Sequence, residues 1–149
     1  EREGITVLHA VPTLLGLFNR DIPGLRIINL GGEMCPPALV DRWARPGRQV
    51  FNTYGPTEAT VSASLAELHA GEPVTIGQPL PNYGLMVLDV NSSDSLQLVP
   101  HGATGELCIT GPGVAALKSA SAAIRPAPKL ASKAHRLVEA ARLPTAMCQ

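Results

Sequence analysis

The sequence predicts an α/β fold in which a partial parallel sheet with flanking helices is followed by a short antiparallel β segment. Three short apolar runs rich in β-branched residues alternate with two segments of helical pattern in residues 1–55. The short connections between them favour parallel pairing through crossovers. From about residue 71 onward, proline and glycine punctuate short extended runs, a pattern typical of antiparallel strands joined by turns.

The first part of the chain contains three predicted strands and two predicted helices. The strands are residues 5–9, 25–30 and 50–54, and the helices are residues 14–18 and 38–44. Pro12 precedes the first helix, and Pro36 and Pro37 precede the second, in positions that favour a first helical turn. The second strand is mostly apolar, as expected for a strand buried on both faces of a sheet.

The second part is predicted to form a small antiparallel sheet. Its strands are residues 85–90, 96–99 and 106–110, with a turn at residues 91–94 between the first two. The chain is therefore divided into one segment over residues 1–70, a second over 71–115, and a tail over 116–149.

The composition excludes several classes of protein. Formal charges cancel to +0 over 149 residues, which argues against binding to nucleic acid through a general excess of positive charge. The sequence holds no apolar run of about 18 residues and predicts no membrane span. Three widely spaced cysteines match neither a disulfide framework nor a zinc site. They favour a reducing compartment, and we expect a cytoplasmic protein.

The neutral total conceals a sharp change in charge near residue 114. Residues 1–113 contain six basic and eleven acidic residues, whereas residues 114–149 contain six basic residues and one acidic residue. The C-terminal stretch is also rich in alanine, and its composition differs from that of the preceding chain. We predict a disordered or weakly helical tail, which could also arise from an altered reading frame.

Polar and small residues follow each of the three predicted parallel strands. His9 ends the first strand, residues 29–33 end the second, and residues 52–58 end the third. Ligands bind beyond the carboxyl ends of the strands in such sheets, which makes these segments the candidate site. Residues 52–58 combine an amide, an aromatic ring, a hydroxyl and a carboxylate at one predicted strand-to-helix turn. Tyr54 offers a flat face for a base, the hydroxyl at the helix start suits an anion, and Glu58 offers an oxygen ligand for Mg²⁺.

Each of these features also has an ordinary structural explanation, and the residues alone leave both open. Residues 52–58 could be a turn that caps a helix beside a half-buried tyrosine, and His9 could be a core histidine with a hydrogen-bond partner. Gly31 and Gly32 could simply end a strand, and Glu33 could be a solvated carboxylate. Spacing by itself favours these structural explanations.

The order Asn-Thr-Tyr-Gly-Pro-Thr-Glu at residues 52–58 resembles the nucleotide-binding motif of AMP-forming adenylating enzymes, in the form typical of adenylation domains of nonribosomal peptide synthetases. A second segment, Gly-Glu-Leu at residues 105–107, resembles another motif of that family at the expected distance. Further similarity lies between the two motifs, at residues 76–79 and 85–89. Four matches in order over residues 5–115 are far more specific than any single one.

The resemblance implies the last strands of a Rossmann-like subdomain, followed by the start of a small β-barrel subdomain. It implies ATP or AMP and Mg²⁺ as cofactors. Thr57 would hydrogen-bond the α-phosphate and Glu58 would help to hold Mg²⁺, so these two are the implied catalytic residues. Tyr54 would stack on the adenine, with Asn52 near its edge. The full set of implied nucleotide contacts is Gly31, Gly32, Glu33, Asn52, Tyr54 and Thr57.

The resemblance also implies a pocket for an amino-acid substrate. Its residues in this sequence are His9, Asn29, Gly31, Thr53, Val61 and Ser62. All except Val61 are small or polar, so a polar amino-acid side chain is expected. The implied reaction forms an aminoacyl-AMP, which is then transferred to the phosphopantetheine of a partner carrier protein.

The resemblance ends after residue 115. Counterparts of the family's upstream phosphate loop, ribose-binding aspartate, hinge and catalytic lysine are absent from this sequence. We therefore expect a fragment of an adenylation domain that is inactive as an isolated chain. Two alternatives stay open: a fragment of an acyl-CoA or aryl-acid ligase of the same superfamily, and a truncated product without catalytic function.

Overall fold

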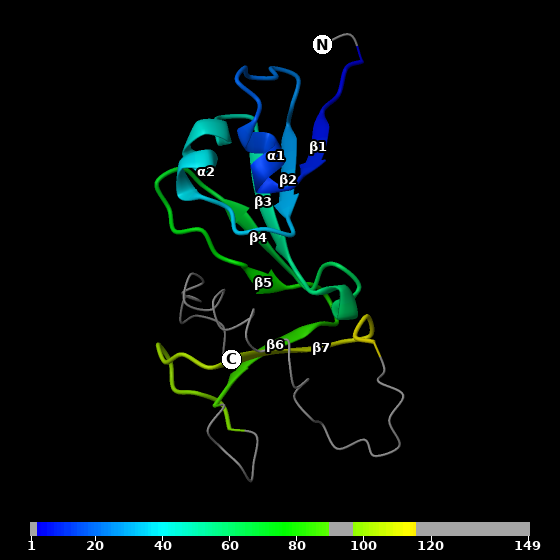
Figure 1. Ribbon diagram of the computed structural model, residues 1–149, viewed down its shortest axis with the longest axis vertical. Helices are drawn as coiled ribbons and strands as arrows, with labels where there is room; N and C mark the ends of the chain where they lie inside the picture. The colour runs from blue at the N-terminus through cyan, green and yellow to red at the C-terminus, as the bar shows by residue number, and fades with distance from the viewer. Residues whose placement is uncertain (1–2, 90–96, 116–149) are drawn as a thin grey trace.

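The computed structural model describes residues 3–89 and 97–115, which form two β-sheets and two short α-helices (Figure 1). The larger sheet has the strand order β1-β2-β3-β4-β5, and β6 pairs with β7 in the smaller sheet. The elements are β1 (Val7–Ala10), α1 (Pro12–Gly16), β2 (Ile27–Gly31), α2 (Pro37–Trp43), β3 (Gln49–Tyr54), the 3-10 helix η1 (Thr57–Ala59), β4 (Ser64–Leu68), β5 (Gln78–Pro79), β6 (Gly84–Leu88) and β7 (Glu106–Thr110). The predicted turn at residues 91–94 and the tail over 116–149 lie outside the described residues.

Strands β1, β2 and β3 are parallel, as the sequence predicts. Their register places His9 beside Asn29, and Gly31 beside Thr53. Pro12 and the proline that opens α2 stand at helix starts, where no N–H group is needed for an intrahelical bond. The prediction of an α/β fold with flanking helices is confirmed.

The chain after β3 differs from the prediction. The sequence predicts a strand-to-helix turn at residues 52–58, but only the single turn of η1 forms, and the chain then returns as β4 antiparallel to β3. The sequence of β4, Ser-Leu-Ala-Glu-Leu, contains strong helix formers. Its alternate residues Ser64, Ala66 and Leu68 are nevertheless buried. Burial of one strand face in the tertiary structure therefore outweighs the local helix preference.

The hydrophobic core joins both helices to one face of the large sheet. Trp43 of α2 is 2% exposed and meets the ring of Phe18 edge-on, with ring centroids 6.4 Å apart. The buried cluster consists of Leu15, Leu25, Ile28, Leu30, Cys35, Leu39, Val40, Trp43, Val50, Ala66 and Leu68. Because side chains alternate between the faces of a strand, Asn29 and Thr53 lie on the opposite face from this core.

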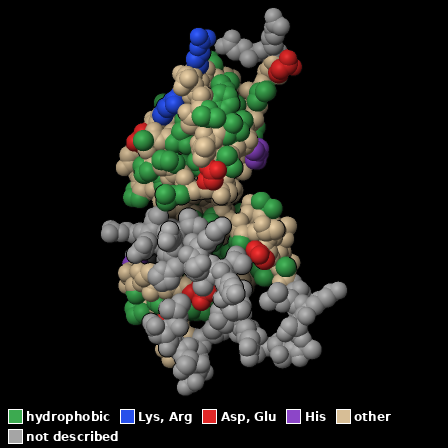
Figure 2. Space-filling model, viewed as in Figure 1, with side chains coloured by type: hydrophobic (Ala, Val, Ile, Leu, Met, Phe, Trp, Pro, Cys, Tyr) green, Lys and Arg blue, Asp and Glu red, His purple; other side chains and the backbone are tan. Residues whose placement is uncertain are grey.

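Strand β1 forms one edge of the described sheet, and the surface around it is apolar. Ile5, Val7, Leu14 and Leu17 are exposed hydrophobic residues of β1, α1 and their flanks. Figure 2 shows hydrophobic side chains across the part of the molecule that contains these elements. None of the described helices is long and apolar enough to cross a membrane.

The smaller sheet pairs β6 with β7 in antiparallel register, with Leu85 beside Ile109. The predicted third strand at residues 96–99 is represented by one isolated bridge between Leu98 and Leu88 within the described residues. Amides on either side of this bridge also pair: Asp89 N donates to Gln97 O over 2.9 Å, and Val99 N donates to Val87 O over 3.0 Å.

Arg48 fastens the start of β3 to the connection that precedes β2. Its side chain is buried, with 6% of the residue exposed. The guanidinium donates to the carbonyl oxygens of Leu25 over 3.0 Å and Ile22 over 2.7 Å, and it pairs with Asp21 over 2.9 Å. It also lies 5.4 Å from the Trp43 ring centroid. The planar fork of arginine satisfies all of these partners at once.

We predict that Arg48→Lys destabilises the fold by about 2–4 kcal/mol, because lysine keeps the charge but leaves buried carbonyl groups unpaired. Urea unfolding of the purified protein measures the change in the free energy of unfolding. The comparison variant is Asp21→Asn, which removes the carboxylate partner of Arg48 and Arg45 but leaves the bonds from Arg48 to Leu25 and Ile22, and it should cost less than Arg48→Lys. Equal effects of the two substitutions would contradict this assignment.

Candidate functional site

The β3–β4 reversal (residues 54–62) contains the two implied catalytic residues. The Ala63 amide donates to the Tyr54 carbonyl over 2.8 Å, which brings the ends of the reversal together. A Cβ atom on Gly55 would lie 2.7 Å from the Ala63 nitrogen and 2.8 Å from the Val61 carbonyl oxygen. These are backbone atoms that cannot rotate away. The closed geometry therefore requires glycine at position 55.

The end of the reversal is held in an unfavourable backbone conformation. Thr60 and Val61 have φ angles of 56° and 71°, in the left-handed region that β-branched residues rarely adopt. The Ser62 amide donates to the Thr60 carbonyl over 2.9 Å within this turn. Such conformations cost roughly 1–3 kcal/mol per residue and are concentrated at functional sites, where surrounding contacts maintain them.

Thr57 and Glu58 are both exposed on η1. Within the described residues, neither side chain is paired with another side chain. No cluster of three or more His, Cys, Asp and Glu residues that could hold a metal ion occurs in the described parts of the chain. Glu58 thus offers a single carboxylate. That fits Mg²⁺, which often takes one or two carboxylates and completes its shell with phosphate oxygens and water.

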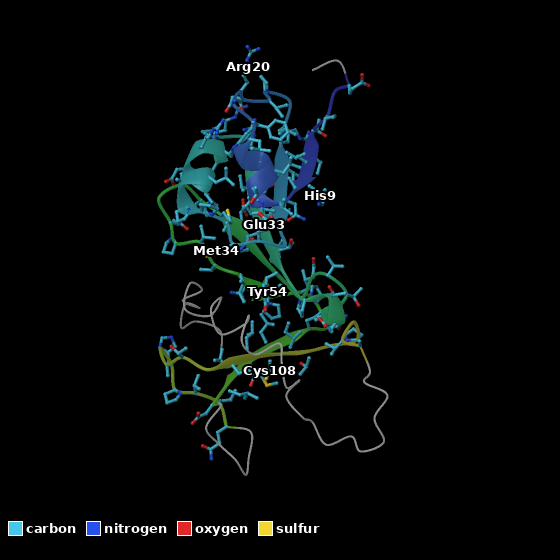
Figure 3. All side chains as sticks on the ribbon, viewed as in Figure 1. His9, Arg20, Glu33, Met34, Tyr54 and Cys108 are labelled. Carbon is cyan, nitrogen blue, oxygen red and sulfur yellow. The ribbon has the colours of Figure 1, made fainter. Side chains whose placement is uncertain are left out.

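Tyr54 lies at the end of β3 that faces the smaller sheet (Figure 3). The residue is half-buried, and desolvation raises the pKa of its hydroxyl, which keeps the phenol neutral. Asn52, two residues earlier on the same face of the strand, is buried, and its amide nitrogen donates to the Thr75 carbonyl over 2.8 Å. One of the two N–H donors of the amide is engaged within the protein, so the second N–H and the oxygen are left for a ligand contact.

The end of β2 and the loop after it place three further predicted residues at the same end of the sheet. Gly31 lies against Thr53, whose hydroxyl oxygen would be 2.5 Å from an added Cβ atom. Gly32 has a φ angle of 79°. The Glu33 carboxylate accepts hydrogen bonds from the Thr13 amide over 3.0 Å and the Thr13 hydroxyl over 2.5 Å, and these bonds lower its pKa. Glu33 thereby links this loop to the start of α1, so it is not merely a solvated carboxylate.

The predicted substrate-pocket residues fall into two groups. His9, Asn29, Gly31 and Thr53 share the sheet face opposite the core, whereas Val61 and Ser62 belong to the β3–β4 reversal. The Asn29 amide nitrogen donates to His9 Nδ1 over 3.2 Å. The Asn29 Oδ1 atom is buried and has no partner among the described residues. His9 is exposed, so the alternative of a core histidine is wrong.

A shallow cleft of about 370 Å³ lies at the opposite end of β3 and β4. Its lining includes Arg45, Glu67 and His69, and it shares no residue with the β3–β4 reversal. The sequence prediction places the site at the carboxyl ends of the parallel strands, which is the other end of the sheet. The candidate residues there come from strands β1, β2 and β3 and from the segments that follow β2 and β3.

Sequence reasoning missed four residues that support the site. Thr13 holds Glu33, Thr75 holds Asn52, and Thr60 and Tyr83 hold the reversal itself. Their partners lie 20, 23, 53 and 24 residues away along the chain. Contacts at such separations leave no local pattern in the sequence.

Comparison with known proteins identifies the family of the chain. The family profile described as AMP-binding enzyme matches residues 1–116. The chain is 66% identical over 115 residues to the Delta-poly-L-ornithine synthetase of Acinetobacter baumannii, covering 77% of this chain and 8% of that protein. It is 41% identical over 114 residues to the nonribosomal peptide synthetase tcpP of Claviceps purpurea, covering 75% of this chain and 5% of that protein.

A solved structure shows the same fold. The artificially fused adenylation–PCP di-domain NpsA-ThdA from Klebsiella oxytoca, described as a nonribosomal peptide synthetase, matches with a TM-score of 0.63 and 28% identity. That match covers 77% of this chain and 24% of the other. The chain belongs to the AMP-binding enzyme family, and it corresponds to part of a nonribosomal peptide synthetase adenylation domain. It spans less than a tenth of the length of the first two relatives.

We predict a pH-dependent contribution of Glu33 to stability. Because its pKa is lowered in the folded state, the contribution is present above the unfolded value of about 4.3 and is lost as pH falls through the lower folded value. Glu33→Gln should therefore lower the urea midpoint at pH 6, and the difference from wild type should shrink below about pH 4. The control is Glu72→Gln, an exposed acid outside this link. If the difference in urea midpoint between wild type and Glu33→Gln stays constant between pH 6 and pH 3, the ionised Glu33 carboxylate does not contribute to stability.

Proposed function

We propose that this chain supplies part of the active site of an enzyme that activates an amino acid with ATP and loads it onto a carrier protein. The observation that supports this most directly is the β3–β4 reversal. It presents a half-buried aromatic ring, an exposed hydroxyl and an exposed carboxylate within five residues, at the carboxyl end of a central parallel strand. Ligands bind at that end of such sheets. We place the reaction in the cytoplasm.

The proposed roles follow from what each group can do. The Tyr54 ring offers a flat face for the adenine, and the backbone of Gly31, Gly32 and Glu33 offers close approach beside it. Asn52 would contribute near the adenine edge through its amide oxygen or its second N–H group. ATP would supply the adenylyl group that is transferred, with Mg²⁺ neutralising the charge of its phosphates.

Thr57 and Glu58 are the proposed catalytic residues. The Thr57 hydroxyl is exposed and can donate a hydrogen bond to a phosphate oxygen, and the Glu58 carboxylate can hold the metal ion. Neither residue is a covalent nucleophile in this proposal. Positioning and charge stabilisation suffice for attack of the amino-acid carboxylate on the α-phosphorus of ATP, which breaks the bond to the β-phosphate and releases pyrophosphate.

For the substrate, we propose an amino acid with a polar side chain. His9, Asn29, Gly31 and Thr53 form a polar patch on one sheet face, and the unpaired Asn29 Oδ1 suits a group that donates hydrogen bonds. Val61 and Ser62 would complete this side of the pocket. The Acinetobacter relative is named for ornithine, whose side chain carries such donors. Ornithine is therefore the first amino acid to test.

We predict that the full-length protein catalyses ATP–pyrophosphate exchange that depends on a polar amino acid. A panel of ornithine, other amino acids, fatty acids and aryl acids measures the preference. Exchange driven only by fatty or aryl acids would contradict amino-acid activation. The isolated 149-residue chain should give no exchange, because it holds only part of the implied phosphate site.

Two substitutions test the assigned roles. Thr57→Val should lower kcat/KM by roughly 10²–10³-fold if the hydroxyl stabilises the transition state. Tyr54→Ala should raise the KM for ATP by roughly 5- to 100-fold through loss of base stacking, whereas Tyr54→Phe keeps the ring and should stay near wild type. Unchanged exchange in Thr57→Val would reject the proposed site.

A further inference from the structure

The loop that follows β7 (residues 111–115) lies directly against the β3–β4 reversal. The Thr60 hydroxyl donates to the Gly113 carbonyl over 2.7 Å, and the Ala115 amide donates to the Glu58 carbonyl over 2.7 Å. Figure 1 shows η1 beside the end of β7 from which this loop departs. Two hydrogen bonds therefore connect segments that are about 55 residues apart in the sequence.

Tyr83 fills the space between the same two segments. Its hydroxyl donates to the Ala59 carbonyl over 3.2 Å. A Cβ atom on Gly113 would overlap that hydroxyl and lie 3.0 Å from the ring carbon that bears it. A Cβ atom on Gly111 would lie 2.9 Å from the Tyr83 ring. Glycine at both positions lets the loop pack directly on the tyrosine.

These contacts surround the strained part of the reversal. Glu58, Ala59 and Thr60 each make one of the three hydrogen bonds, and Thr60 is also the first of the two left-handed residues. A strained conformation persists only where its surroundings fix it. Among the described residues outside the reversal, the 111–115 loop and Tyr83 make contacts that can hold Thr60 and Val61 in this backbone conformation.

We propose that the 111–115 loop and Tyr83 form a clamp that positions Thr57 and Glu58, with Thr60 and Tyr83 as positioning residues. The clamp couples the small sheet to the proposed nucleotide site, because each of its hydrogen bonds joins η1 or Thr60 to that sheet or its flanks. Its effect on ATP rests on the proposed function, whereas its effect on the conformation of the reversal does not.

The first experiment compares Thr60→Val with Thr60→Ser in the full-length protein. Valine keeps the β-branch and the backbone cost but removes the donor, whereas serine keeps the hydroxyl. Amide hydrogen exchange at Ala115 reports the clamp without any ligand. Exchange should accelerate by about three- to tenfold in Thr60→Val, the equivalent of one hydrogen bond, and should stay near wild type in Thr60→Ser. Equal exchange in wild type and Thr60→Val overturns the clamp.

The same variants test the coupling to the nucleotide site. The dissociation constant of a non-hydrolysable ATP analogue with Mg²⁺, measured by calorimetry, should rise about three- to tenfold in Thr60→Val and recover in Thr60→Ser. An unchanged constant together with faster Ala115 exchange would overturn the positioning role, although the clamp would stand. If Thr57→Val also leaves ATP–pyrophosphate exchange unchanged, the proposed function fails instead.

A second pair of substitutions keeps the test valid if Thr60→Val does not fold. Gly113→Ala forces a Cβ atom into the Tyr83 hydroxyl, and Tyr83→Phe removes that hydroxyl. Gly113→Ala should therefore accelerate Ala115 exchange strongly in the wild-type background and less in the Tyr83→Phe background. If the two substitutions have additive effects on Ala115 amide exchange, Gly113 does not pack on the Tyr83 hydroxyl and the clamp is overturned.

Discussion

The tight return of the chain from β3 into β4 is the constraint on which the proposed site depends. It is possible only with glycine at position 55, where any side chain would meet the backbone of residues 61–63. Few residues separate this glycine from the start of β4, so the backbone must turn sharply. It makes one turn of 3-10 helix and then two left-handed residues before it pairs with β3 again. This path leaves Thr57 and Glu58 exposed at the carboxyl end of the strand.

Contacts from two other parts of the molecule support the surroundings of that return. On one side, Glu33 bonds Thr13 and fixes the loop after β2 against α1. On the other side, Thr60 bonds the loop after β7. A site built this way combines the ends of strands with loops that hydrogen bonds hold in place. The shallow cleft at the far end of the sheet shares no residue with the reversal and has none of these supports.

The parts of the fold that were predictable are those encoded by local patterns. Strands β1 to β3 are short apolar runs, and prolines mark the starts of both helices, so their order and parallel pairing follow from the sequence. Strand β4 was not predictable, because alanine, leucine and glutamate favour helix and only burial selects the strand. The motif at residues 52–58 located the candidate site, but the partners of Asn52, Glu33 and Thr60 come from distant segments.

The central claim is that the β3–β4 reversal and the loop after β2 bind the nucleotide. Amide hydrogen exchange of the full-length protein, with and without a non-hydrolysable ATP analogue and Mg²⁺, tests it most directly. The account predicts slower exchange in residues 31–33 and 54–62 when the nucleotide is present, with no change in residues 44–48 and 67–70 around the opposite cleft. Protection at the cleft without protection at the reversal would contradict it.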